Sequence, residues 1–219
     1  MSGSFIGESN IEQVVAVIIE IGHRIDTDTW TQDVTYTNCW WITHGEGKPV
    51  KVDENGEEYT ERASLSLCNS NPRSWYLDDS NNRLYVHTSG SDNPGGDSYI
   101  ILSYLYERLA SHEIVLDGHP YGGYLDRSSV PSITLQTGEY YEGGTQESFG
   151  TLRFGNADGY FDTRLDTYIY EAKRIWLYLG KYGAAWSDYV LYWTGWTGNV
   201  SWSDLWIEVD IEDLRTCIL

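Results

Sequence analysis

The chain has 219 residues, enough for one large β domain or for two domains of about 100 residues each. Its formal net charge is −19, from 14 basic and 33 acidic residues, which excludes binding to nucleic-acid phosphates or anionic membranes through a basic surface. Tyrosine (18 copies) and tryptophan (10 copies) dominate the aromatic residues, and such flat, amphipathic rings favour strands and interfaces.

The first half of the chain predicts short strands between polar turns. The apolar, β-branched run 14–21 predicts a buried strand, and an irregular loop or edge hairpin is expected at 23–38. An aromatic segment follows at 39–43, and Asn55-Gly56 is a hairpin turn signal. Further strands are expected at 63–68, 73–77 and 83–88, and the last two are expected to pair across the turn 78–82.

The middle of the chain is ambiguous, and the second half again predicts strands. Segment 99–109 begins like a strand, although 104–112 also fits a helix. The glycines and proline within 117–129 predict a domain boundary or crossover. At 168–179, a short helix or loop is expected to give way to a strand near Lys173. The expected strands of this half are 131–137, 147–154, 173–179, 188–194, 199–202 and 206–211.

The last of these strands has the clearest alternation in the chain. Ile207, Val209 and Ile211 share one face, and acidic residues occupy the other. Taken together, these patterns predict a mainly β protein with little helix, built from two β-rich domains that are sandwich-like or split-barrel-like. The expected domains are residues 1–116 and residues 117–219.

The cysteines and the apolar segments indicate where the protein folds. Cys39, Cys68 and Cys217 form no Cys-x-x-Cys pair, and their odd number and wide spacing argue against a secreted disulfide framework. The apolar run 14–19 is too short to cross a bilayer, and the N-terminus lacks the basic region of a signal peptide. We therefore expect a soluble protein that folds in a reducing compartment, without membrane insertion.

Motifs for catalysis and cofactor binding are absent from the sequence. It contains no G-x-S-x-G elbow, P-loop, H-E-x-x-H or G-x-G-x-x-G motif, and its five histidines lack metal-ligand spacing. We therefore expect no enzyme activity, no catalytic or metal-binding residues and no cofactor. Carboxylates are so numerous that composition alone does not exclude the paired acids of a glycosidase.

A polar turn follows the strand expected at 147–154. It contains Asn156, Asp158, Gly159, Phe161 and Asp162. Asparagine, aspartate and glycine tolerate the left-handed backbone of tight turns, and Phe161 returns an aromatic ring to the core. We interpret these five residues as a structural turn.

A cation site is the alternative interpretation of this turn. An EF-hand loop would place its first and last ligands at Phe154 and Leu165, neither of which offers a side-chain oxygen. Asp158, Asp162 and Asp166 could still gather a hard cation, but a backbone-capping turn explains them more simply.

Two stretches resemble the tail-tip and baseplate-hub proteins of long-tailed bacteriophages. One is Phe-Gly-Thr-Leu-Arg-Phe-Gly-Asn-Ala-Asp-Gly-Tyr-Phe-Asp at 149–162, and the other is Trp-Tyr, a polar turn and Leu-Tyr-Val-His-Thr within 74–88. The resemblance implies a hub-like β domain at 117–219 and a structural role at the distal end of the tail. The virion would then contain the protein, which would assemble in the host cytoplasm.

The same resemblance implies partners and contact residues. We expect binding to other tail or baseplate proteins and a homo-oligomeric ring, without direct binding to nucleic acid. Acidic faces would point to the DNA channel or to solvent, and faces rich in Tyr and Trp would make the contacts. The candidate contact aromatics are Trp193, Trp196, Trp202 and Trp206.

A carbohydrate-binding module for host-surface recognition is the alternative function. The mixture of aromatic and aspartate residues would build a sugar platform, with Trp40, Trp41 or Trp196 stacking on a sugar ring. A hydrolase is a third hypothesis, and it would require turnover of a glycan or of peptidoglycan.

Overall fold

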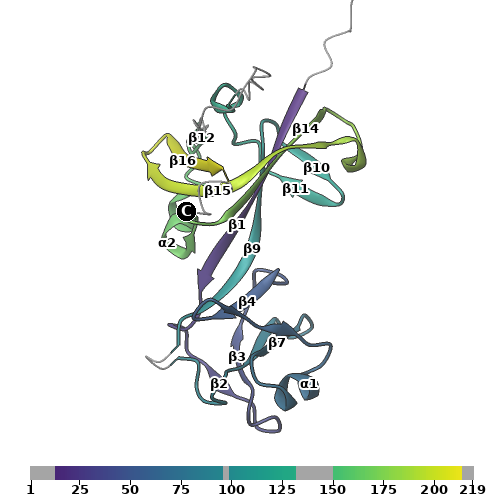
Figure 1. Ribbon diagram of the computed structural model, residues 1–219, viewed down its shortest axis with the longest axis vertical. Coiled ribbons are helices and arrows are strands. Elements are labelled where there is room, and N and C mark those ends of the chain that lie inside the picture. The colour runs from purple at the N-terminus through teal and green to yellow at the C-terminus, as the bar shows by residue number, and fades with distance from the viewer. Residues whose placement is uncertain (1–12, 96–98, 132–149, 214–219) are drawn as a thin grey trace, which may run out of the picture. The chain divides into compact units, whose positions relative to one another are not determined.

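The computed structural model describes residues 13–95, 99–131 and 150–213, and strands dominate them (Figure 1). The prediction of a mainly β protein with little helix is therefore confirmed. Of the strand expected at 131–137, only position 131 belongs to the described residues. Cys217 lies outside them.

Contacts divide the described chain into two compact units that are not consecutive halves. Unit 1 comprises 13–20, 107–131, 150–165 and 170–213. Unit 2 comprises 21–95, 99–106 and 166–169. The domain boundary expected near residue 116 stays a prediction. The boundaries between the two contact units lie at 20/21, 106/107, 165/166 and 169/170.

Unit 1 is built on a sheet with the strand order β12-β16-β15-β14-β1-β9. These strands are β12 (Gly150–Gly155), β16 (Trp206–Asp213), β15 (Val190–Trp202), β14 (Arg174–Lys181), β1 (Gln13–Arg24) and β9 (Ile101–Ala110). The pairs β12–β16, β16–β15, β15–β14 and β14–β1 are antiparallel. The predicted alternation along β16 is confirmed, because Ile207, Val209 and Ile211 are all buried.

Two strands expected at 188–194 and 199–202 form the single strand β15. Its pairing with β16 shifts register between Thr197 and Val200, so the strand bulges there rather than ending. Ser203 and its neighbours form a tight connection between Trp202 and Trp206, with Ser203 N donating to Trp206 O at 2.8 Å.

Shorter elements complete unit 1. The segment 117–129 includes the turn of a hairpin, in which Asp117 and Gly118 both have positive φ. The elements are β10 (Ile114–Leu116), β11 (His119–Tyr121), the 3₁₀ helices η1 (Arg127–Ser129) and η2 (Trp186–Asp188), and the first part of α2 (Asp162–Thr167). The expected change from helix or loop to strand near Lys173 is confirmed, because β14 begins at Arg174.

Unit 2 contains a five-stranded sheet with the order β2-β3-β8-β7-β6. Its strands are β2 (Thr31–Gln32), β3 (Trp40–Thr43), β8 (Arg83–His87), β7 (Ser74–Asp78) and β6 (Thr60–Glu61). The predicted β7–β8 hairpin is confirmed, with Trp75 opposite Val86. Further pairs join β9 to β4 (Lys51–Glu54), β4 to β5 (Glu57–Glu58) across Asn55-Gly56, and β13 (Tyr168–Ile169) to β1.

Two local predictions are corrected by the structure. The strand expected at 63–68 is wrong, because Leu65–Ser70 is the helix α1, whose first turn is capped by the Ser64 hydroxyl accepting from Leu67 N. The helical alternative at 104–112 is also wrong, because β9 continues to Ala110. Cys39 and Cys68 are both buried, unbridged thiols.

Candidate functional site

The predicted turn lies between β12 and α2 in unit 1, and its own polar groups hold it. Asn156 is only 3% exposed. Its Oδ1 accepts from Phe161 N at 2.8 Å, and its Nδ2 donates to Asp162 Oδ1 at 2.7 Å. Gly159 supplies the left-handed backbone, with φ +71°, and its amide donates to Asn156 O. The side-chain amide and the carbonyl oxygen of Asn156 are therefore used to form the turn.

Asp158 is also engaged within this turn. Its Oδ1 accepts from Tyr160 N at 3.1 Å, and its Oδ2 accepts from the Tyr124 hydroxyl at 3.0 Å. The rings of Tyr124 and Tyr160 stack with centroids 4.5 Å apart. In the part of the chain that the structure describes, no three His, Cys, Asp or Glu side chains are placed to hold a metal ion together.

Phe161 anchors the turn in the core of unit 1. Its side chain is almost completely buried. The rings of Tyr124, Phe154, Tyr160 and Tyr170 surround it, with centroid distances between 5.0 and 6.5 Å. Most of these contacts are edge-to-face, an arrangement that aromatic quadrupoles favour.

A buried carboxylate that sequence analysis missed lies beside this aromatic cluster. Glu107, near the end of β9, is only 3% exposed. Arg164 forms an ion pair with it and donates from Nε to Glu107 Oε2 at 2.7 Å. The Tyr160 hydroxyl donates to Oε1 at 2.7 Å, and the Tyr170 hydroxyl donates to Oε2 at 3.0 Å. The network joins β9, the turn and the segment before β14.

The network changes how two tyrosines titrate. Burial, and then the negative charge of Glu107, raise the pKa of Tyr160 and of Tyr170 above the usual value. A phenolate beside Glu107 would place two negative charges in the same buried space. Both hydroxyls therefore remain protonated donors at neutral pH.

We expect this shift to make the protein less stable in alkali. Tyrosines of the unfolded chain lose their protons near pH 10, whereas Tyr160 and Tyr170 of the folded protein retain theirs to higher pH. Above about pH 10 the folded state therefore binds more protons, and the free energy of unfolding falls as pH rises.

Urea unfolding at about pH 8 and about pH 11 would measure this fall in stability. Tyr170→Phe should reduce the fall, because it removes one shifted group. An equal fall in the native protein and in the Tyr170→Phe variant would contradict the assignment.

The four candidate contact aromatics lie in different surroundings, and only two of them are exposed at the same turn. Trp202 and Trp206 flank the β15–β16 turn and are 70% and 40% exposed, and Leu205 between them is 60% exposed. We call Trp202, Leu205 and Trp206 the hairpin tip. The ring of Trp193 instead occupies the space that a side chain at Gly195 would need, and Trp196 lines a pocket farther along β15.

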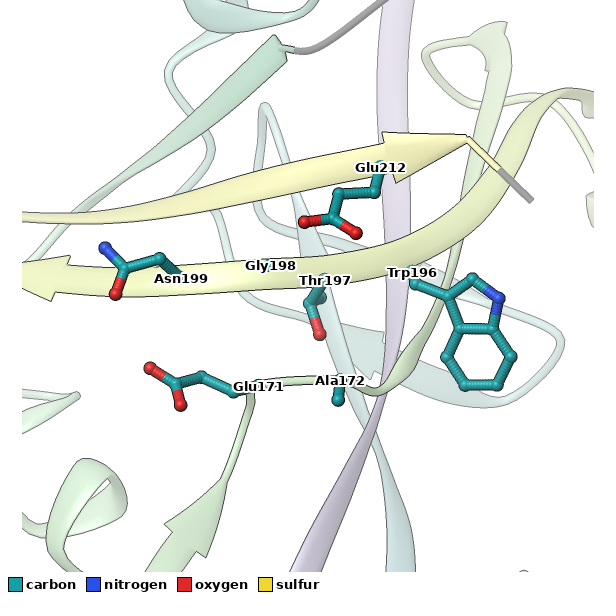
Figure 2. A pocket seen from close by; sticks show the side chains of 7 residues that line it. All are labelled: Glu171, Ala172, Trp196, Thr197, Gly198, Asn199 and Glu212. Atoms are coloured by element: carbon teal, nitrogen blue, oxygen red, sulfur yellow. The ribbon is translucent and has the colours of Figure 1, made fainter. Parts of the chain in front are cut away.

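This pocket, in unit 1, has a volume of about 520 Å³ (Figure 2). Figure 2 shows the indole of Trp196 at one end, with the side chains of Glu171, Asn199 and Glu212 around the space. The remaining lining residues are Ala172, Thr197 and Gly198. The pocket lies at the bulge of β15, where a regular strand would place its side chains differently.

Backbone hydrogen bonds fix the floor of this pocket. Ala172 N donates to Thr197 O at 2.9 Å, and Thr197 N donates to Lys173 O at 2.8 Å. The buried Thr197 hydroxyl donates to Tyr170 O and accepts from Lys173 N at 2.9 Å. The segment that carries Glu171 is therefore held against β15, and the pocket is defined by the fold.

A second pocket of about 690 Å³ lies beside the turn in unit 1. Tyr124, Asp158 and Trp206 line it together with Arg127 and His112. The hydroxyl of Tyr124 and the carboxylate of Asp158 are bonded to each other, as described above. This pocket therefore offers fewer uncommitted polar groups than the pocket beside Trp196.

Trp40 and Trp41, the other candidates for sugar stacking, lie in unit 2. Trp40 packs against the buried cluster that contains Trp75 and Leu84. The guanidinium of Arg83 lies over the ring of Trp41, 3.9 Å from its centroid. Neither ring lines one of the two pockets described above, whereas Trp196 lines the first of them and is therefore the sugar-stacking candidate in a pocket.

Comparisons with known proteins give no independent assignment. Neither a scan against protein-family models nor a search of curated proteins found a match. Among the described residues, no helix has the length and apolar character required to cross a membrane.

Proposed function

We propose that this protein is a structural component of the tail tip or baseplate of a long-tailed bacteriophage and assembles with other tail proteins. The resemblance at 149–162 and within 74–88 supports this role. The use of Asn156, Asp158 and Asp162 in hydrogen bonds within the turn region also supports it, because a structural turn requires such bonding.

The hairpin tip is the observation that carries the proposal. Two tryptophans and a leucine are exposed together at one turn of a protein with net charge −19. Grouped apolar side chains at a surface mark protein contacts, and tryptophan is enriched among the residues that dominate binding energy. We assign the hairpin tip to the contact with the neighbouring copy in a ring.

Charge determines the conditions under which such a ring forms. Copies that each carry a charge of −19 repel one another, and salt screens that repulsion. Self-association is therefore expected to strengthen as salt increases, unless a basic partner protein neutralises the contact faces.

Replacing Trp202 and Trp206 together with serine tests this contact. We expect self-association to weaken by about 30-fold or more, because each buried interface tryptophan contributes strongly to affinity. Sedimentation velocity across a range of salt concentrations would measure the change. Tyr182→Ser is the matched control, because it removes an exposed aromatic side chain outside the hairpin tip.

Two outcomes would contradict the contact. One is a protein that stays monomeric under every condition, including in the presence of other tail proteins. The other is a double variant that assembles as well as the native chain.

Carbohydrate binding is the second candidate, and one observation favours it. The pocket places the Trp196 indole near carboxylate and amide groups that can accept hydrogen bonds from hydroxyls. A glycan array would test it, and saturable binding that disappears in Trp196→Ala would support it. Turnover of a glycan would instead support the hydrolase hypothesis.

A further inference from the structure

The pocket beside Trp196 is negatively charged, and no basic residue lines it. Glu171 and Glu212 contribute two carboxylates, and Asn199 adds an amide. Within the described residues, neither carboxylate belongs to an ion pair. The hydrogen bond of Glu171 is a long one, from Val200 N at 3.4 Å, so the carboxylates retain acceptor capacity.

The indole of Trp196 supplies a surface that attracts cations. It already interacts with one guanidinium, because Arg174, its register partner on β14, lies 5.2 Å from the ring centroid. Arg174 does not line the pocket, so the pocket volume stays open beside the ring. Tryptophan has the strongest attraction for cations among the aromatic side chains.

We propose that this pocket binds an arginine side chain of a partner protein. A guanidinium is planar, stacks on an indole and donates in a fork to carboxylates, which are the groups that surround this space. Its positive charge also offsets the negative charges of Glu171 and Glu212. A neutral sugar would leave both of these charges without a counter-charge.

The inference rests on the proposed function in one respect, namely that the arginine belongs to a partner protein. The pocket and the hairpin tip consist of different residues, so either contact can fail alone. The arginine would come from a tail protein that is less acidic than this chain.

The Trp196 indole Nε1–H resonance in a ¹H–¹⁵N spectrum reports directly on this pocket. Trp196→Phe assigns the resonance by its loss, and the rest of the spectrum shows whether each variant is folded. The probe is Nα-acetyl-arginine methylamide, and its neutral isostere Nα-acetyl-citrulline methylamide is the control. We expect a saturable shift in roughly the millimolar range with arginine, and binding of citrulline weaker by about tenfold or more.

Variants of the carboxylates test the charge requirement. Glu171→Gln with Glu212→Gln should weaken arginine binding by about tenfold or more, because each substitution removes a charged acceptor and preserves its shape. Glu113→Gln, which neutralises an exposed carboxylate just before β10, should leave arginine binding unchanged.

The proposal is overturned if citrulline shifts the resonance as strongly as arginine, or if arginine produces no saturable shift. It is also overturned if methyl glucoside binds and arginine does not, which would assign the pocket to carbohydrate. None of these results alters the sedimentation of the hairpin-tip variant, so failure of the pocket is distinguishable from failure of the assembly role.

Discussion

Replacing Phe161 with alanine is expected to lower the free energy of unfolding by about 3–5 kcal/mol. The ring is buried among Tyr124, Phe154, Tyr160 and Tyr170, and truncation would leave a cavity that these large rings fill poorly. Urea unfolding followed by circular dichroism would measure the loss.

Tyr182→Ala is the control for this substitution, because Tyr182 is an exposed aromatic in the same unit. We expect it to change stability by about 0.5 kcal/mol or less. If Phe161→Ala had a similarly small effect, Phe161 would not anchor the turn, and the structural interpretation of 156–162 would be wrong.

Replacing Glu107 with alanine is also expected to lower the free energy of unfolding by about 3–5 kcal/mol. The substitution leaves the partly buried guanidinium of Arg164 without its counter-ion, and it removes the acceptor of two tyrosine hydroxyls. The same urea experiment would measure the loss.

Glu208→Ala provides a matched comparison on the surface. Glu208 also pairs with an arginine, Arg153, but both side chains are substantially exposed. Such pairs contribute about 1 kcal/mol or less. Equal losses for the two variants would show that burial of Glu107 does not control the strength of its interactions.

The strands were predictable where alternation and turn residues agree. In β16, the burial of alternate residues follows directly from the sequence. The β7–β8 hairpin was predictable because two strand-like runs flank a short polar turn. Helix α1 was missed because Leu65 and Leu67 alternate as in a strand, while the Ser64 cap that favours the helix is a local hydrogen bond.

The turn was predictable from its residues, but its surroundings were not. Asn156, Gly159 and Phe161 have the local roles that their residue types indicate. Glu107 was missed because its ion-pair partner is Arg164, 57 positions away. An acidic residue inside the mostly apolar run 100–110 was the available signal, because such a charge is buried only with a partner.

The residues of the Trp196 pocket are brought together by the register of paired strands. Their spacing along the sequence therefore could not predict the pocket. Glu171 and Glu212 are 41 positions apart in the sequence, and they line the same pocket at the bulge in β15. The sequence predicts Trp196 as a contact or sugar-stacking aromatic, but no spacing in it groups Trp196 with these carboxylates rather than with Trp202 and Trp206.

Locating the protein in phage particles tests the assembly role most directly. Particles produced by cells that carry the gene would be purified, washed and analysed by quantitative mass spectrometry, with immunogold labelling in the electron microscope. The account predicts a fixed copy number per particle and label at the distal end of the tail. Absence of the protein from washed particles, or label confined to the capsid, would contradict it.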